Sequence, residues 1–197
     1  NMIEFLKGQV AFKAEDYVVI EVNNIGYKVF MARTSIEQIE TNNIIKIFTY
    51  MRVLQDDVSL FGFLSNEELN MFELLITVGG IGAKSALSIL SNITPTDFAM
   101  AVVSDDVNKL KSLPGIGPKT AQRIVLELKD KMKHEQIIEE SKNIEKQIQE
   151  NENIKDAISA LQVLGYNLKS IEKAFEKIET SSKTTEDLIK DGLKELS

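Results

Sequence analysis

Two copies of one glycine-rich motif are the residues in this sequence best suited to hold an anion. The copies occupy residues 78–86 (VGGIGAKSA) and 113–121 (LPGIGPKTA), and each has helix-like sequence on both sides. A tight glycine turn between two helices leaves backbone N–H groups exposed at the start of the second helix, where the helix dipole is positive. Such turns bind phosphate, and two of them in one chain indicate a polyanion such as a nucleic acid backbone.

Each position of the motif has a chemical reason. The first glycine of Gly-Ile-Gly allows the positive φ of a tight turn, and the second lets a phosphate approach the amides because it has no Cβ. The lysine two residues later adds a mobile charge, and an arginine extends the basic patch of the second copy. The predicted DNA-contacting residues are Gly80, Gly82, Lys84, Gly115, Gly117, Lys119 and Arg123. The alternative is that the turns only pack helices against one another.

Two nucleotide-binding motifs are similar to these residues but do not fit. A P-loop requires glycine directly before the lysine, where Ala83 and Pro118 stand. A dinucleotide-binding fingerprint requires a last glycine where Ser85 and Thr120 stand. We therefore expect no ATP or NAD site and no other cofactor.

Composition limits the possible functions further. The net charge of −7 argues against a general nucleic-acid binder, but residues 1–63, 64–133 and 134–197 carry net charges of −2, 0 and −5. Cysteine is absent, which excludes disulfides and thiol chemistry, and the single histidine, His134, excludes a histidine-rich metal site. No apolar run approaches the ~20 residues of a membrane span, and no signal-peptide pattern opens the chain. We expect a cytoplasmic protein without a metal centre or membrane contact.

The N-terminal residues, 1–63, predict a small β-barrel. They hold runs rich in β-branched and aromatic residues at 17–22, 26–31, 44–50, 51–54 and 58–63. Five or six short strands in a segment of this length are typical of an OB-type barrel.

From Ser65 the apolar period becomes helical. Residues 64–133 predict an all-helical domain around the two glycine turns, with a short helix at 104–113 and a longer one at 118–133. Capping patterns at Ser65, Thr94 and Thr184 mark three helix starts. Residues 134–152 are polar and predict a flexible linker. Residues 153–197 predict a three-helix bundle that binds another protein. The predicted fold class of the whole chain is therefore α+β with several domains.

The order of barrel, paired glycine-turn helices, linker and bundle resembles the RuvA family of bacterial Holliday-junction-binding subunits. The resemblance covers the whole chain and is most specific over residues 61–133. It implies that the motifs are two helix-hairpin-helix elements that grip the duplex arms of a four-way junction. It also implies a homotetramer or an octamer, binding of the RuvB hexameric ATPase to the third domain, and a junction shared with the RuvC resolvase. ATP would then be used by the partner.

The resemblance assigns two further sets of residues. A central acidic pin maps to Gln55, Asp56 and Asp57, although the family has Glu-Asp at the first two of these positions, so the acidic pair is shifted by one here. Carboxylates at the centre of a tetramer would repel phosphates and keep the crossover open. The alternative is a polar hairpin tip in solvent. The candidates for partner binding are Leu164, Gly165, Tyr166 and Leu168.

Two other classes of function remain alternatives. A helix-hairpin-helix glycosylase would need a catalytic aspartate, for which Asp130 is the candidate. A metal-dependent nuclease would need clustered carboxylates, for which the pairs Asp105-Asp106 and Asp56-Asp57 are candidates by composition. A protein-interaction scaffold would use the glycine turns for packing alone. The function we predict is non-catalytic, structure-specific binding of four-way junction DNA through its backbone, which holds the junction open for the RuvB motor in recombination and repair.

Overall fold

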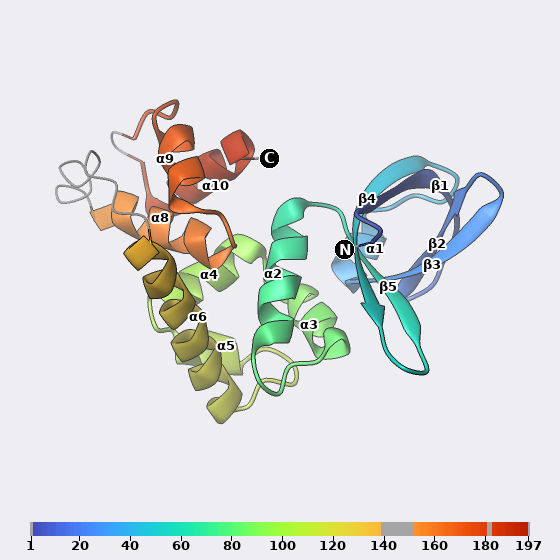
Figure 1. Ribbon diagram of the computed structural model, residues 1–197, viewed down its shortest axis with the longest axis horizontal. Coiled ribbons are helices and arrows are strands. Elements are labelled where there is room, and N and C mark those ends of the chain that lie inside the picture. Colours follow the sequence, from blue (N-terminus) through green and yellow to red (C-terminus); the bar gives the residue numbers. More distant parts are fainter. Residues whose placement is uncertain (1, 139–151, 181–182, 197) are drawn as a thin grey trace.

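The chain folds into a β-barrel lobe and a helical lobe (Figure 1). The computed structural model describes residues 2–138, 152–180 and 183–196. Both glycine motifs belong to the helical lobe, and the predicted acidic pin belongs to the barrel lobe.

Five strands close the barrel in the order β1-β2-β3-β5-β4. All neighbouring pairs are antiparallel except β3 and β5, which are parallel. A short helix, α1 (Arg33–Glu37), connects β3 to β4, and alternating apolar side chains fill the interior. The strands are β1 (Phe5–Lys13), β2 (Tyr17–Val22), β3 (Ile25–Met31), β4 (Ile44–Val53) and β5 (Val58–Phe63). The predicted barrel is therefore confirmed.

The strands differ in two respects from those predicted. Sequence patterns indicated no strand before residue 17, yet β1 pairs with both β2 and β4; Gly8 and Gln9 interrupt its apolar alternation. Residues 44–50 and 51–54 were predicted as separate strands. They form one strand because the pairing of β4 with β5 continues without a break to Val53.

The helical lobe contains the predicted helices, with caps where the sequence placed them. Ser65 Oγ accepts a hydrogen bond from Glu68 N at 3.3 Å, and Thr94 Oγ and Thr184 Oγ cap their own helices in the same way. The helices are α2 (Asn66–Thr77), α3 (Ala83–Leu90), α4 (Pro95–Val103), α5 (Val107–Lys111), α6 (Pro118–Ile138), α8 (Glu152–Val163), α9 (Leu168–Phe175) and α10 (Thr185–Leu196).

Two helix boundaries differ from the prediction. The short helix predicted at 104–113 is confined to α5, because Asp105 has a positive φ of 56° and Asp106 caps the helix. The helix predicted to end at residue 133 continues to Ile138, into the segment predicted as linker. Residues 139–151 of that predicted linker lie outside the described residues.

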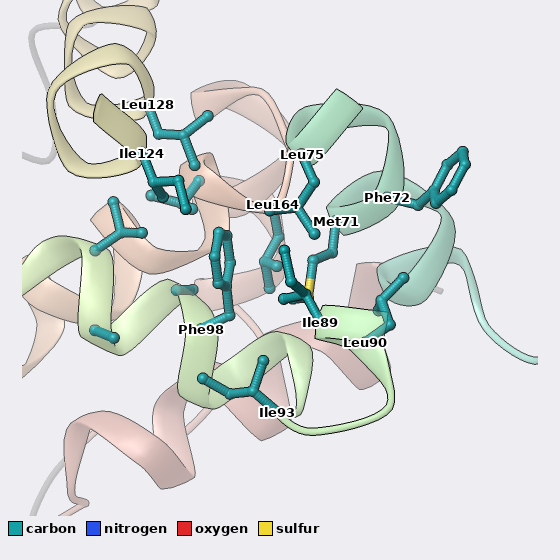
Figure 2. Close-up of a cluster of buried hydrophobic side chains, with 14 of the residues drawn as sticks. Met71, Phe72, Leu75, Ile89, Leu90, Ile93, Phe98, Ile124, Leu128 and Leu164 are labelled. Atoms are coloured by element: carbon teal, nitrogen blue, oxygen red, sulfur yellow. The ribbon is translucent and has the colours of Figure 1, made fainter. Parts of the chain in front are cut away.

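The central and C-terminal helices share one hydrophobic core. Met71, Ile89, Phe98 and Ile124, from α2, α3, α4 and α6, are 0% exposed, and so is Leu164, which directly follows α8. Figure 2 shows these side chains gathered in one cluster. The C-terminal helices are therefore packed on the central ones, an arrangement that the sequence pattern did not indicate.

Phe72 on α2 joins the helical lobe to the barrel. Its side chain points away from the cluster in Figure 2 and is 0% exposed. Its ring centroid lies 5.4 Å from that of Tyr50, 5.2 Å from Phe61 and 4.9 Å from Phe63. Aromatic packing of this kind fixes α2 against β4 and β5.

We expect Phe72→Ala to lower the free energy of unfolding by about 3–5 kcal/mol, because it leaves a cavity between the lobes. The measurement is urea denaturation followed by circular dichroism. The matched control is Phe5→Ala on the barrel surface, where Phe5 is 51% exposed. Equal losses for the two variants would contradict the assigned role of Phe72.

Candidate nucleic-acid interface

The first glycine turn, between α2 and α3, has the geometry of an anion site. Gly80 has a φ of +97°, and Ile81 is buried and donates a hydrogen bond from its N–H to Val78 O at 3.0 Å. Ala86 N donates to Gly82 O at 2.9 Å, the first hydrogen bond of α3. The N–H groups of residues 83–85, which come before Ala86 in α3, therefore have no partner within the helix. They lie at its N-terminal end, where the helix dipole is positive.

The second turn, between α5 and α6, repeats this geometry. Gly115 has a φ of +78°, and Ile116 N donates to Leu113 O at 3.1 Å. Ala121 N donates to Gly117 O at 2.9 Å. Pro118 begins α6 as predicted, at a position where no N–H is needed. The same hydrogen bonds hold both turns, which confirms that the sequence repeat is a structural repeat.

The second glycine of each motif is not explained by the packing of the protein itself. Neither Gly82 nor Gly117 has a positive φ. A Cβ built at either residue meets no atom within 4 Å. A larger residue would fit both positions in the free protein, so the glycines favour a ligand that approaches the backbone over the alternative that the turns only pack helices.

The two motif lysines are available to such a ligand. Lys84 and Lys119 are exposed, and neither forms an ion pair with any residue that the structure describes. Lys109 on α5, close to the second turn in the sequence, is engaged instead: its Nζ lies 2.8 Å from Asp97 Oδ1. That hydrogen bond, with a second from Thr94, holds the pKa of Asp97 below its usual value.

Arg123 connects the two turns, a role that the sequence did not reveal. Its Nη1 donates to Gly79 O in the first turn at 2.9 Å, and its Nε lies 3.5 Å from Glu127 Oε1 on the same helix. A Cβ at position 79 would lie 2.7 Å from that Nη1, so Gly79 leaves room for the bond. The guanidinium predicted to contact phosphate thus holds α6 against the first turn.

We expect Arg123→Lys to weaken DNA binding by about tenfold although it keeps the charge, because a lysine does not reproduce the bond to Gly79. The slope of log affinity against log salt should stay near that of the original chain. The measurement is a salt titration of DNA binding by fluorescence anisotropy.

Arg123→Gln is the matched variant, since it removes the charge as well. If Arg123→Lys binds as tightly as the original chain and only Arg123→Gln loses affinity, Arg123 acts as a phosphate contact and the positioning role is wrong.

The residues predicted to form an acidic pin lie at an exposed hairpin tip between β4 and β5. Leu54 N donates to Asp57 O at 2.8 Å, which closes the tip. Asp57 accepts a hydrogen bond from Ser59 Oγ and lies 3.8 Å from Arg52 Nη2. Asp56 is exposed and forms no ion pair within the described part of the chain. The two carboxylates are therefore not equivalent: Asp57 has a hydrogen bond and a nearby cation, and Asp56 has no ion pair with a described residue.

The tip and both glycine turns lie toward the same edge in the view of Figure 1. Figure 1 shows the β4–β5 tip, the α2–α3 turn and the α5–α6 turn along the lower edge of the view.

The candidate partner-binding residues serve largely to attach the C-terminal helices. Leu164 is 0% exposed, and Leu168 is partly buried. Gly165 has a φ of +87° in the turn that follows α8. Tyr166 Oη donates to Glu67 Oε1 on α2 at 3.1 Å. Burial, and then the nearby Glu67 carboxylate, raise the pKa of Tyr166 above its usual value.

Two of the carboxylates considered for catalysis, Asp105 and Asp106, have structural roles. Asp105 pairs with Lys129 at 2.6 Å, and Asp106 accepts from Lys109 N at the start of α5. The side chain of Asp130 lies outside the description. Within residues 2–138, 152–180 and 183–196, no three potential metal ligands of the His, Cys, Asp or Glu type come together, and no single helix has the length and apolar character to cross a membrane.

Known families match the chain along most of its length. The RuvA N terminal domain matches residues 2–62, the SAM-like helix-hairpin-helix tandem matches residues 72–130, and the RuvA C-terminal domain matches residues 152–197. The Holliday junction branch migration complex subunit RuvA of Lachnospira eligens is 42% identical over 204 residues, covering 99% of each chain. The protein of the same name from Acetivibrio thermocellus is 42% identical over 200 residues, covering 100% of this chain and 99% of its own.

Proposed function

The chain belongs to the RuvA family, and on that premise we propose that it binds four-way DNA junctions in recombination and repair. It does so as the non-catalytic subunit of a branch-migration complex. The observation that carries the proposal is the pair of glycine turns with matching hydrogen bonds, in which Gly82 and Gly117 stay open to an approaching backbone.

Recognition then depends on the shape of the DNA more than on its sequence. The turns offer backbone amides and lysines, which suit phosphate oxygens and carry little base information. A homotetramer would present four pairs of turns to four arms, with the pins at the centre. Carboxylates there would repel phosphates and keep the crossover open. We propose the tetramer, or an octamer of two such rings, together with the central position of the pin.

The C-terminal helices are the part that we propose for binding the RuvB motor, which would supply ATP hydrolysis. Tyr166 bonds to Glu67 and Gly165 lies next to Asn70, both on α2, so motor binding at these residues and at Leu168 would act next to the helix that leads into the first glycine turn. Leu164 would support that surface from the core. RuvC would share the junction, in the bacterial cytoplasm.

We expect the chain to shift a four-way junction in a native gel at concentrations that leave linear duplex of the same arm sequence free. Lys84→Ala with Lys119→Ala should weaken junction binding and lower the salt slope by about 0.9 for each phosphate that the variant no longer neutralises. The matched control is Lys169→Ala with Lys173→Ala on α9, which removes the same charge far from the turns along the chain.

An original chain that binds junction and duplex equally would favour the scaffold alternative. An unchanged slope in the Lys84/Lys119 variant would remove the phosphate assignment of these two lysines. Incubation of the purified chain with junction and magnesium tests the enzyme alternative, because strand cleavage would require a catalytic site.

The pin residues should differ in effect. We expect Asp56→Asn to tighten junction binding by roughly fivefold, because it removes a repulsive charge that has no partner in the described part of the protein. We expect it also to reduce the fluorescence of 2-aminopurine placed at the crossover, since the bases there would stack more. Asp57→Asn is the control and should change both readings less. Equal effects would show that the contacts of Asp57 with Ser59 and Arg52 do not restrain its charge.

A further inference from the structure

A groove of about 680 Å³ lies between the barrel and α3. We call it the barrel–hairpin groove. The barrel wall provides Lys28, Phe30 and Arg52, and α3 provides Lys84 and Ser88. Lys84 also belongs to the first glycine motif, and Arg52 stands on β4 just before the pin. The groove therefore connects the first anion site to the acidic pin.

The lining has a positive charge excess in a chain whose net charge is −7. Four cationic side chains line it, together with the carboxylates of Glu15, Asp16 and Asp57. Lys28 Nζ is held 4.1 Å from the ring centroid of Tyr17 and 4.9 Å from that of Phe30. Lys28 forms no ion pair with a described residue, so its charge is held in place but not neutralised.

Arg52 has hydrogen-bonding capacity that the protein does not use. Its Nε is buried and has no acceptor within the described residues. Its Nη2 lies 3.8 Å from Asp57 Oδ2, which is longer than a normal hydrogen bond. Buried donors are nearly always paired with protein or with water. The Arg52 side chain as a whole is 38% exposed, so its other nitrogens are open to a ligand. An anion in the groove would give the guanidinium an acceptor.

The remaining walls suit a sugar–phosphate backbone. Phe30, Leu60, Phe61 and Leu87 form an apolar surface, and the α3 side has small hydroxyl residues. Cationic side chains beside apolar and aromatic surface are typical of channels that follow a single nucleic-acid strand. Protein on both sides of the groove favours one strand over a duplex.

We propose that the barrel–hairpin groove holds the backbone of one DNA strand as it passes from the first glycine turn toward the crossover. The inference rests on the proposed function. It adds Lys28 and Arg52 to the junction-binding residues, and neither belongs to a helix-hairpin-helix element. Arg33 also lines the groove, but its Nε is paired with Glu37 Oε1 at 3.1 Å. The barrel thus contributes attraction beside the repulsion of the pin.

The test compares junction with linear duplex for Lys28→Gln combined with Arg52→Gln. We expect about a tenfold loss of junction affinity and a lower salt slope, with duplex affinity unchanged within about twofold, because only a junction sends a single strand into the groove. Lys28→Gln alone should give a smaller loss of junction affinity. This single variant keeps the partly buried Arg52, so a loss of affinity in it is not due to a folding defect caused by replacing that arginine.

Lys46→Gln is the matched control. Lys46 Nζ lies 4.7 Å from the ring centroid of Phe5 and 4.8 Å from that of Phe48, the same kind of setting outside the groove. Equal losses for Lys46→Gln and Lys28→Gln, or equal losses on junction and duplex, would overturn the proposal. An original chain without junction preference would instead contradict the proposed function itself.

The absence of cysteine allows a direct map of the strand. An iron–EDTA probe attached to Ser88→Cys should cut junction DNA within a few nucleotides of the crossover. The same probe on Gln9→Cys, in β1 and outside the groove, should not. Cuts from Ser88→Cys that fall only in the distal arms would place the strand elsewhere and overturn the inference.

Discussion

Backbone amides left open at the starts of α3 and α6 are the feature that the rest of the structure supports. Ile81 and Ile116 are buried and hold each turn in the core, while Ala86 and Ala121 are 0% exposed and let the helices approach closely. These anchors fix the direction of the amides before any ligand arrives. Preorganised donors of this kind bind phosphate without a further cost of ordering the loop.

The separate pieces of the surface are aligned by a few long-range contacts. Arg123 bonds the second hairpin to the first turn, and Phe72 packs α2 onto the barrel beside the β4–β5 hairpin. Because of these contacts, the two glycine turns and the acidic tip have defined positions relative to one another. An acidic chain can bind a polyanion where its cations gather locally, and here the excess acid lies mainly in residues 134–197, away from the glycine turns.

The C-terminal helices are joined to the DNA-binding lobe through both apolar and polar contacts. Leu164 enters the shared core, and Tyr166 bonds to Glu67 on α2, the helix that leads into the first glycine turn. A partner that binds the C-terminal helices would therefore act on α2, which leads into the first of the proposed anion sites at the start of α3. This contact gives a physical route between the proposed motor surface and the proposed DNA surface.

The sequence by itself determined the features that depend on neighbouring residues. The positive φ of Gly80 and Gly115, the caps at Ser65 and Thr94, and the barrel class all follow from local chemistry over a few positions. Only the tertiary structure decided that Arg123 bonds to Gly79, 44 residues away, and that Tyr166 bonds to Glu67, 99 residues away. Likewise, Lys28 and Lys84 share a groove only because β3 and α3 pack on facing sides of it. Contacts between distant segments are set by how whole elements pack, and the periodicity of any single element carries no information about that.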